Sequence, residues 1–310
     1  MQNESEQARF QRVVKLLRDD GRINEAFVAE EVEAAARAGV AGAAALAATV
    51  AAVGYGRAQD WDAALDWLAA AAQGGDAGAR AQLRLLADAD GDDWGALARG
   101  VDLAAWRAAR PTQLVVEGPR IGVAEGFLEP RACAWLMARA APMQRASLVY
   151  HPTTGKPAED DVRSNTTGTF ALLDLDLPTV LIRERIAATM GVPVAHLERT
   201  SVFRYEAGQA FTDHFDFLAP SPQLDDEIRR KGQRPLTFLV YLNDDFDAGE
   251  THFIALLRKL RGGVGDALFF YNVDETGAPD LRTQHEGAPP TRGVKWLLSQ
   301  FIRDKPQLQG

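Results

Sequence analysis

The stretch from Phe211 to Asp216 reads Phe-Thr-Asp-His-Phe-Asp and places His214 and Asp216 two positions apart. If this stretch is a β-strand, the two side chains point to the same face and can hold one metal ion. His285 lies 69 positions after Asp216, and Lys295 lies ten positions further on. Two imidazoles and one carboxylate that leave other coordination positions open suit non-haem Fe(II). The His-x-Asp pattern alone is common by chance, so its meaning depends on the surrounding chain.

Short apolar segments separated by Gly- and Pro-containing turns surround this stretch. The pattern predicts strands at residues 121–127, 200–206, 211–217, 236–242, 250–254, 267–271 and 294–302. Helical spacing of apolar residues predicts helices that begin at Pro130 and at about Pro178. Many short strands with such turns are typical of a β-sandwich or jelly roll, and we expect the helices to cover one face.

The first hundred residues have a different composition, which favours helix. Residues 5–100 are rich in alanine, leucine, glutamate and arginine. A spaced set recurs 36 positions later: Ala35, Gly39, Ala41, Gly42, Ala43 and Ala45 return as Ala71, Gly75, Ala77, Gly78, Ala79 and Ala81. Such a period is typical of helix-turn-helix arrays. The composition changes near Arg110-Pro111, so we expect a helical-repeat domain at 1–108 and a second domain at 109–310, with its core at about 197–304.

Length, charge and cysteine content limit the classes of protein. A chain of 310 residues has room for two domains. The net charge of −9 and the lack of a basic run disfavour nucleic-acid binding. The single cysteine, Cys133, cannot form an internal disulfide and suits a reducing compartment. The polar start does not resemble a secretory signal, and no apolar run reaches transmembrane length. We therefore expect a cytoplasmic protein without a membrane partner.

Several stretches together resemble a known family. They are Arg204–Gln209, His214–Asp216, Thr237–Asn243, Gly249–Phe253, Gly265–Phe270, and His285–Pro290 followed by Gly293–Trp296. In order and spacing, the segment from about Val123 to Asp304 resembles the Fe(II)- and 2-oxoglutarate-dependent dioxygenases of the prolyl 4-hydroxylase type. The family's usual Gly-Gly-Glu-Thr is Ala-Gly-Glu-Thr here, with Ala248 in a turn. Residues 31–90, around Gly54–Leu68, resemble Sel-one-like repeats, which are relatives of the tetratricopeptide repeat.

The resemblance implies an α+β chain with a C-terminal double-stranded β-helix (jelly roll) and flanking helices, preceded by an all-α repeat domain. It implies that His214, Asp216 and His285 bind iron and form the catalytic centre. Lys295 would pair with the distal carboxylate of 2-oxoglutarate, although a lysine at that point can also begin a strand at a solvated rim.

The resemblance also assigns three further residues. Tyr205 and Tyr241 would line the cosubstrate pocket, and Tyr241 fits equally well as a packed core tyrosine. Arg163 would lie near the substrate, with a surface ion pair as the alternative.

The implied reaction is hydroxylation of prolyl residues in a protein or peptide, with succinate and CO2 as coproducts. It would use Fe(II), 2-oxoglutarate and O2, with ascorbate as a candidate reductant. The helical repeats would recruit the protein substrate or a partner, or would only pack on the second domain or on a twin chain. The loops at 147–167 and 218–234 would set specificity. Three alternatives remain: a 2-oxoglutarate hydroxylase of a small molecule or free amino acid, a non-catalytic repeat-based scaffold, and a cupin-like metal enzyme that does not use 2-oxoglutarate. The sequence does not determine the oligomeric state.

Overall fold

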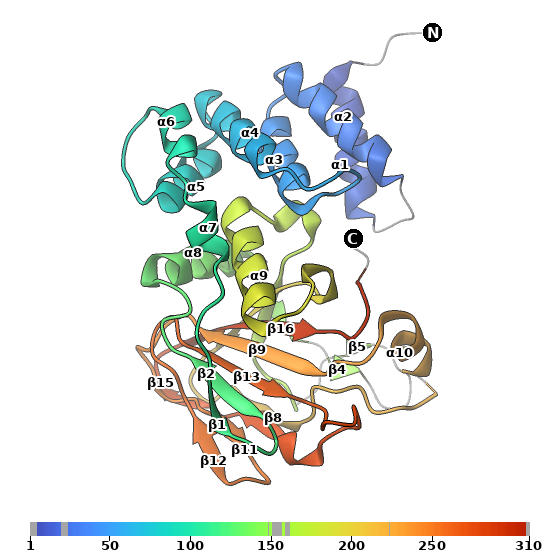
Figure 1. The fold of residues 1–310 in the computed structure, drawn as a ribbon, viewed down its shortest axis with the longest axis vertical. Helices are drawn as coiled ribbons and strands as arrows, with labels where there is room; N and C mark the ends of the chain where they lie inside the picture. The colour runs from blue at the N-terminus through green and yellow to red at the C-terminus, as the bar shows by residue number, and fades with distance from the viewer. Residues whose placement is uncertain are drawn as a thin grey trace. The chain divides into compact units, whose positions relative to one another are not determined.

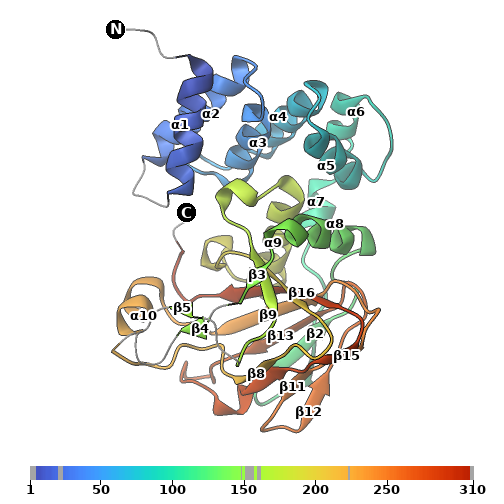
Figure 2. The same ribbon diagram turned by 180° about the vertical axis from the view of Figure 1, so that it is seen from behind.

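The computed structural model describes residues 5–19, 24–147, 149–150, 157–158, 162–222 and 224–307. These residues divide into two compact units, which are described separately (Figures 1 and 2). Unit 1 holds the described residues up to Ala108 together with Ala171–Arg185, and unit 2 holds those within Ala109–Phe170 and Ile186–Leu308. Among the described residues, no helix has the length and apolar character needed to span a membrane.

Unit 1 is helical. Its helices up to Ala108 are α1 (Glu6–Arg18), α2 (Glu25–Arg37), α3 (Ala43–Val53), α4 (Trp61–Gln73), α5 (Ala77–Ala87), α6 (Trp94–Arg99) and α7 (Leu103–Arg107). Most begin at a side chain that accepts a hydrogen bond from a backbone N–H of the first turn, namely Ser5, Asn24, Asp60, Asp76, Asp93 and Asp102. Such caps satisfy donors that the helix itself leaves free, so the sequence specifies where each helix starts.

The 36-residue period of the sequence is a repeated pair of helices. Helices α2 and α4 have the same length and start 36 positions apart. Each ends in the same way: Gly39 and Gly75 have a positive φ, and the residue after each glycine donates back to Ala35 O or Ala71 O. This hydrogen-bond pattern is a Schellman motif, in which glycine avoids the strain of a left-handed backbone. The recurring small residues therefore have a defined structural role.

A segment from later in the chain completes unit 1. It contains the short 3-10 helix η2 (Leu172–Asp174) and the first part of α9 (Leu177–Met190). Leu172 and Leu175 pack in the core that α1, α2 and α3 form. Arg185 Nε donates to Trp106 O at 2.8 Å. The expected boundary had placed this segment in the second domain, because composition alone does not show which partner a helix packs against.

Two main antiparallel β-sheets make up most of the described part of unit 2. The larger sheet has the strand order β1-β2-β13-β9-β16-β7-β6-β3 and the smaller has the order β12-β11-β14-β8. The larger sheet consists of β1 (Gln113–Val116), β2 (Ile121–Ala124), β3 (Arg145–Ala146), β6 (Thr166–Thr169), β7 (Ser201–Tyr205), β9 (Leu236–Tyr241), β13 (Ala267–Tyr271) and β16 (Lys295–Ile302). The smaller consists of β8 (Phe211–His214), β11 (Thr251–Phe253), β12 (Arg258–Leu260) and β14 (His285–Gly287).

Shorter elements complete unit 2. They are α8 (Pro130–Ala140), α10 (Asp225–Lys231), the 3-10 helices η1 (Ala141–Met143), η3 (Val194–His196) and η4 (Leu281–Thr283), and the paired strands β4 (Val149–Tyr150) with β5 (Pro157–Ala158) and β10 (Asp247–Ala248) with β15 (Pro290–Arg292). One buried cluster joins residues of both main sheets, including Phe203, Leu239 and Leu297 from the larger and Phe253 from the smaller. This core between two sheets confirms the jelly-roll prediction.

The structure differs from the expected elements in several places. Strand β8 ends at His214, so Asp216 lies beyond the strand in a bend and does not share its face by strand alternation. The polar connection at 218–234 contains α10, whose acidic first turn and basic last turn are a helix signal that apolar periodicity misses. Strand β6 is polar and was not predicted. Ten of the 21 residues of the expected loop at 147–167 lie outside the described residues.

Candidate metal centre and cosubstrate pocket

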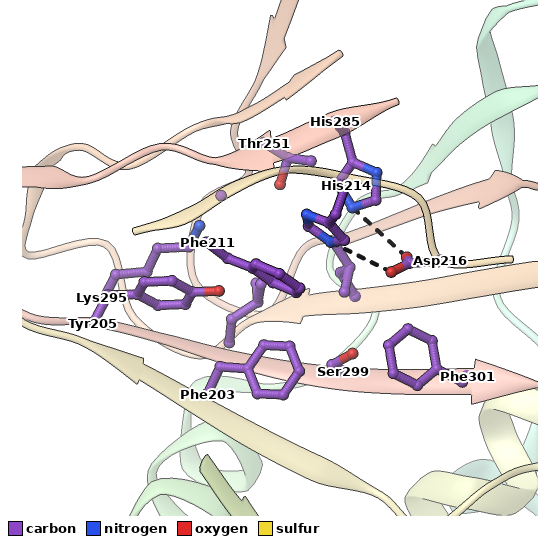
Figure 3. Close-up of a pocket in the computed structure, with 13 residues that line it drawn as sticks. Phe203, Tyr205, Phe211, His214, Asp216, Thr251, His285, Lys295, Ser299 and Phe301 are labelled. Carbon is purple, nitrogen blue, oxygen red and sulfur yellow. Dashed lines mark ion pairs between the residues drawn. The ribbon is translucent and has the colours of Figure 1, made fainter. Parts of the chain in front are cut away.

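His214, Asp216 and His285 come together in unit 2. His214 ends β8 and His285 begins β14, and the two residues are direct partners in the antiparallel register. Each of the three side chains offers one ligand atom, and these atoms all lie within 4.8 Å of one another. Figure 3 shows both imidazoles turned toward Asp216, with His214 Nε2 3.4 Å from Oδ1 and His285 Nε2 3.6 Å from Oδ2. Residues brought from distant positions thus form one triangular face.

Backbone carbonyls fix the tautomer of both histidines. His214 Nδ1 lies 2.7 Å from Thr212 O, and His285 Nδ1 lies 3.0 Å from Thr283 O. A carbonyl oxygen only accepts, so each Nδ1 carries the proton and donates it. The lone pair of each imidazole is then on Nε2, the atom that faces Asp216. Both histidines make this contact with the carbonyl two residues earlier, so both rings present an unprotonated Nε2 that can bind a metal.

The charges of the three side chains also suit a divalent cation. Burial, together with His214, lowers the pKa of His285 to about 4, so the ring is neutral at pH 7. Burial alone would raise the pKa of Asp216, but the two imidazoles and the hydroxyl of Thr237 hold it below its usual range. A neutral His285 imidazole and an ionised Asp216 carboxylate are the forms that bind a metal without first losing protons.

Lys295 is a buried cation without a partner. Its side chain is 0% exposed, and Nζ has no hydrogen-bond partner within the described part of the chain. The rings of Tyr205 and Tyr241 lie 5.0 and 5.6 Å from Nζ. Burial lowers the pKa of Lys295 to about 7. The lysine therefore does not sit at a solvated rim, and its position favours an anionic ligand that the protein itself does not supply.

Lys295 and the three metal-ligand candidates line one pocket. The lining residues are Phe203, Tyr205, Phe211, His214, Asp216, Leu239, Thr251, His285, Gly287, Lys295, Leu297, Ser299 and Phe301. Figure 3 shows Lys295 and Tyr205 at one end and the His-Asp-His group at the other. At Gly287, a Cβ atom would lie 3.1 Å from the hydroxyl of Tyr205, so the absence of a side chain there leaves room for that hydroxyl.

The two tyrosines named from the sequence are placed differently. Tyr205 lines the pocket, whereas Tyr241 is not among the lining residues. The hydroxyl of Tyr241 donates to Leu260 O at 3.0 Å and lies 3.1 Å from Thr251 Oγ1. Because the proton of Tyr241 is used by a carbonyl, its hydroxyl oxygen accepts the proton of Thr251, so the Thr251 oxygen that lines the pocket is an acceptor. Tyr241 acts on the site by orienting Thr251.

Arg163 lies beside the pocket and does not line it. Its guanidinium stacks over Phe203 and Phe211, with 4.5 and 4.6 Å to the ring centroids. It donates to Asn165 Oδ1 at 3.1 Å and to Thr167 Oγ1 at 3.3 Å. Within the described residues it forms no ion pair, so the alternative of a surface ion pair is not what the structure shows. Burial lowers its pKa, although Asp216 opposes that effect.

Sequence reasoning missed several residues of the pocket. Thr251 stood within a quoted motif without an assigned role, and Ser299 shares a strand face with Lys295 in β16. Strand alternation places Lys295, Leu297, Ser299 and Phe301 on one side, and all four line the pocket. That alternation was the available signal for Ser299 and Phe301. Phe203 and Phe211 could not be identified because apolar residues on strands are usually core.

Comparison with known proteins identifies the family. Residues 200–303 match the family model described as the 2OG-Fe(II) oxygenase superfamily. Prolyl 4-hydroxylase 1 of Arabidopsis thaliana is 33% identical over 207 residues, which cover 62% of this chain and 72% of that relative. The chain belongs to the prolyl 4-hydroxylase family.

Two further proteins match over a shorter range or at lower identity. A putative prolyl 4-hydroxylase of Acanthamoeba polyphaga mimivirus is 36% identical over 126 residues, covering 40% of this chain and 52% of that protein. A viral collagen prolyl hydroxylase of Paramecium Bursaria Chlorella virus-1, solved with 2-oxoglutarate, has 23% identity and a TM-score of 0.45, covering 61% of this chain and 98% of that one.

The donor set fits the cofactors of the prolyl 4-hydroxylase family, Fe(II) and 2-oxoglutarate. Two neutral imidazoles and one carboxylate suit Fe(II). An unpartnered ammonium in the same pocket suits the distal carboxylate of a dicarboxylic acid. The protein is thus a 2-oxoglutarate-dependent dioxygenase of the prolyl 4-hydroxylase type, as the sequence predicted.

Proposed function

We propose that this dioxygenase hydroxylates prolyl residues of a protein or peptide and forms succinate and CO2. The observation that carries the proposal is the pocket that contains both the His-Asp-His group and the unpartnered Lys295. The prolyl specificity follows from the relatives, which are named prolyl 4-hydroxylases. No feature of the described residues favours the scaffold or small-molecule alternatives.

The proposed roles follow from the contacts. His214, Asp216 and His285 hold Fe(II), and their fixed Nδ1–H tautomers remove the need to reorganise the rings. Lys295 pairs with the distal carboxylate of 2-oxoglutarate, while Tyr205 presents its hydroxyl group along the length of the cosubstrate. When bound, Fe(II) with 2-oxoglutarate and O2 supplies the oxidation that hydroxylates a C–H bond. The aromatic and aliphatic lining excludes water from the reacting atoms, and ascorbate is a candidate reductant.

Arg163 is the proposed contact for the peptide substrate. Two aromatic rings of the pocket wall hold its guanidinium, and no carboxylate of the described residues neutralises it. A guanidinium held in this way can donate to backbone carbonyls of an extended peptide. We expect Arg163→Gln to raise the KM for peptide with little change in the KM for 2-oxoglutarate.

Turnover assays test the proposal. Succinate formation is expected to need Fe(II), to rise with a proline-containing peptide and to be abolished in His214→Ala. The same peptide with alanine in place of proline is the matched control. If a free amino acid or another small molecule stimulates turnover and no proline-containing peptide does, the prolyl assignment is wrong. A lack of Fe(II)-dependent 2-oxoglutarate decarboxylation would leave the scaffold alternative.

We further propose that unit 1 recruits the protein substrate through its Sel-one-like helix pairs. A cleft of about 420 Å³ lies between α2 and the connection from α3 to α4, lined by Ala26, Ala29, Glu30, Glu33, Gly56, Arg57, Ala58, Gln59 and Asp60. We expect Glu30→Lys to raise the KM for an intact protein substrate and to leave the KM for a short peptide unchanged. Equal KM values for wild type and variant with the protein substrate would contradict recruitment at this cleft.

A reducing, cytoplasmic location is also proposed. Cys133 is buried, and burial raises the pKa of its thiol to about 12, which makes it an inert core residue. Because the sequence has one cysteine, the protein contains no internal disulfide that a reducing compartment would break. Fractionation of cells that express the tagged full chain tests the location, and recovery outside the cytoplasm would contradict it.

A further inference from the structure

Two buried polar side chains form a series of hydrogen bonds that ends at the carboxylate of Asp216. Thr237, on the central strand β9, places Oγ1 2.8 Å from Asp216 Oδ2. Asn272, directly after β13, places Nδ2 3.0 Å from the same Oγ1. Both side chains are 0% exposed. Two buried polar side chains need a reason, because burying a polar group costs free energy unless it is hydrogen-bonded, and Asn272 Oδ1 has no partner among the described residues.

The direction of these hydrogen bonds is determined by a backbone carbonyl. Asn272 Nδ2 also lies 3.1 Å from Arg234 O, which can only accept, so the NH2 group of the amide must be on that side. Its second proton then points to Thr237 Oγ1. Since Thr237 accepts that proton, its own hydroxyl proton is free to go to Asp216 Oδ2. The chain therefore runs as a series of donors from Asn272 through Thr237 to the carboxylate.

We propose that Thr237 and Asn272 are positioning residues for Asp216, which hold Oδ2 and leave Oδ1 to the metal. The inference rests on the proposed metal site and goes beyond it. A carboxylate can bind a metal through one oxygen or through both. A donated hydrogen bond to Oδ2 makes that oxygen the poorer ligand and so favours binding through one oxygen. One coordination position then stays open for the cosubstrate.

The test uses Co(II), whose visible absorption reports its coordination, with the full chain and two variants of nearly equal size. Thr237→Val removes the donor, and Thr237→Ser keeps it. Groups that orient metal ligands commonly change metal affinity about 10- to 100-fold. We expect Thr237→Val to weaken Co(II) binding by about tenfold or more and Thr237→Ser to stay within about threefold of wild type. The Co(II) spectrum of the valine variant should also respond less to added 2-oxoglutarate.

The outcomes separate this inference from the proposed function. If wild type binds Co(II) and Thr237→Val binds it equally tightly with an unchanged spectrum, Thr237 only stabilises the core and the inference is wrong. If wild type itself does not bind Co(II), the metal site fails. Should Thr237→Val not fold, Asn272→Ala tests the same chain, since it leaves the threonine hydroxyl without a fixed direction. Weaker Co(II) binding then supports the inference, and wild-type affinity overturns it.

Discussion

At the scale of single residues, the site depends on a lysine that is buried even when no anionic ligand is bound. Lys295 has no hydrogen-bond partner among the described residues, and its pKa is lowered to about 7 by burial. A buried ammonium is unfavourable until an anion is beside it. The free protein near neutral pH is therefore divided between neutral and charged lysine, whereas the complex with a dicarboxylate needs the charged form. Ligand binding and proton uptake are linked at this residue.

The first prediction concerns the pH dependence of 2-oxoglutarate binding. Above pH 7 the free lysine is mostly neutral, so binding must take up a proton, and the Kd should rise by about tenfold per pH unit between pH 8 and 9. Calorimetry in buffers of different ionisation enthalpy measures the proton uptake. Lys295→Arg is the matched control, because a guanidinium stays charged and should show no such slope. A wild-type Kd that is constant from pH 6 to 9 would contradict the account.

The second prediction concerns the stability of the metal-free and ligand-free protein. The pKa of Lys295 is lower in the folded state than in the unfolded chain, so its contribution destabilises the fold below pH 7 and fades as the pH rises toward 10.5. Lys295→Met removes an unsatisfied buried group and should raise the free energy of unfolding at pH 7 by about 1–3 kcal/mol. Thermal melts at pH 7 and at pH 10 measure the effect, which should be smaller at the higher pH. A less stable methionine variant would be inconsistent with an unpartnered lysine.

The residues that carry the chemistry could be predicted from the sequence, but the contacts that orient their side chains could not. His214, Asp216, His285 and Lys295 stand in motifs whose order and spacing resemble one family. The carbonyls that fix the imidazole tautomers, and the Thr237–Asn272 chain, depend on strand register and on one buried side-chain contact. Neither kind of contact can be recognised from the residue types in the sequence. Tyr241 shows the same limit, because its hydroxyl is directed away from the pocket by Leu260 O.

At the scale of elements, the strands were predicted where apolar residues are continuous and missed where they are not. Strand β13 matches its expected range, and β9 and β16 differ from theirs by one residue at one end. Polar β6 was missed because its residues are stabilised by pairing with β7, which the local pattern does not show. The end of β8 at His214 was also missed. A strand was assumed to continue through Asp216, whereas a bend brings that carboxylate to the histidines.

The third prediction concerns the turn at the family's Gly-Gly-Glu-Thr motif. Ala248 has a φ of 59°, a conformation that costs a non-glycine residue about 1–2 kcal/mol. Ala248→Gly relieves that strain and loses about 0.4–1 kcal/mol to the more flexible unfolded chain. The net change should be a stabilisation of about 0.5–1 kcal/mol, measured by chemical denaturation. Loss of stability in Ala248→Gly would show that the turn is not strained.

The fourth prediction concerns the repeated helix ends. Gly39 and Gly75 both have a positive φ, and a Cβ atom at either would meet nothing within 4 Å, so only backbone strain opposes a side chain. Gly39→Ala and Gly75→Ala should each destabilise the protein by about 1 kcal/mol. Similar values for both would support a true structural repeat. A neutral effect at one position alone would indicate that the two turns are not equivalent.

At the scale of the whole chain, the two units do not correspond to two continuous stretches of sequence. The composition change near residue 108 is visible in the sequence, but residues 171–185 pack in unit 1. The helical spacing of their apolar residues predicts a helix but does not show which elements that helix packs against. The family membership concerns the dioxygenase part, where residues 200–303 match the family model.

The most direct test of the account is a calorimetric titration of 2-oxoglutarate without O2, into the metal-free protein, the Mn(II)-loaded protein and Mn(II)-loaded Lys295→Met. The central claim is that one ligand spans the His-Asp-His group and the buried lysine. The account predicts one binding site in the Mn(II)-loaded wild type and at least about 100-fold weaker binding when either the metal or the lysine is missing, as for loss of a buried charge-assisted pair. Equal affinity in all three samples would contradict it.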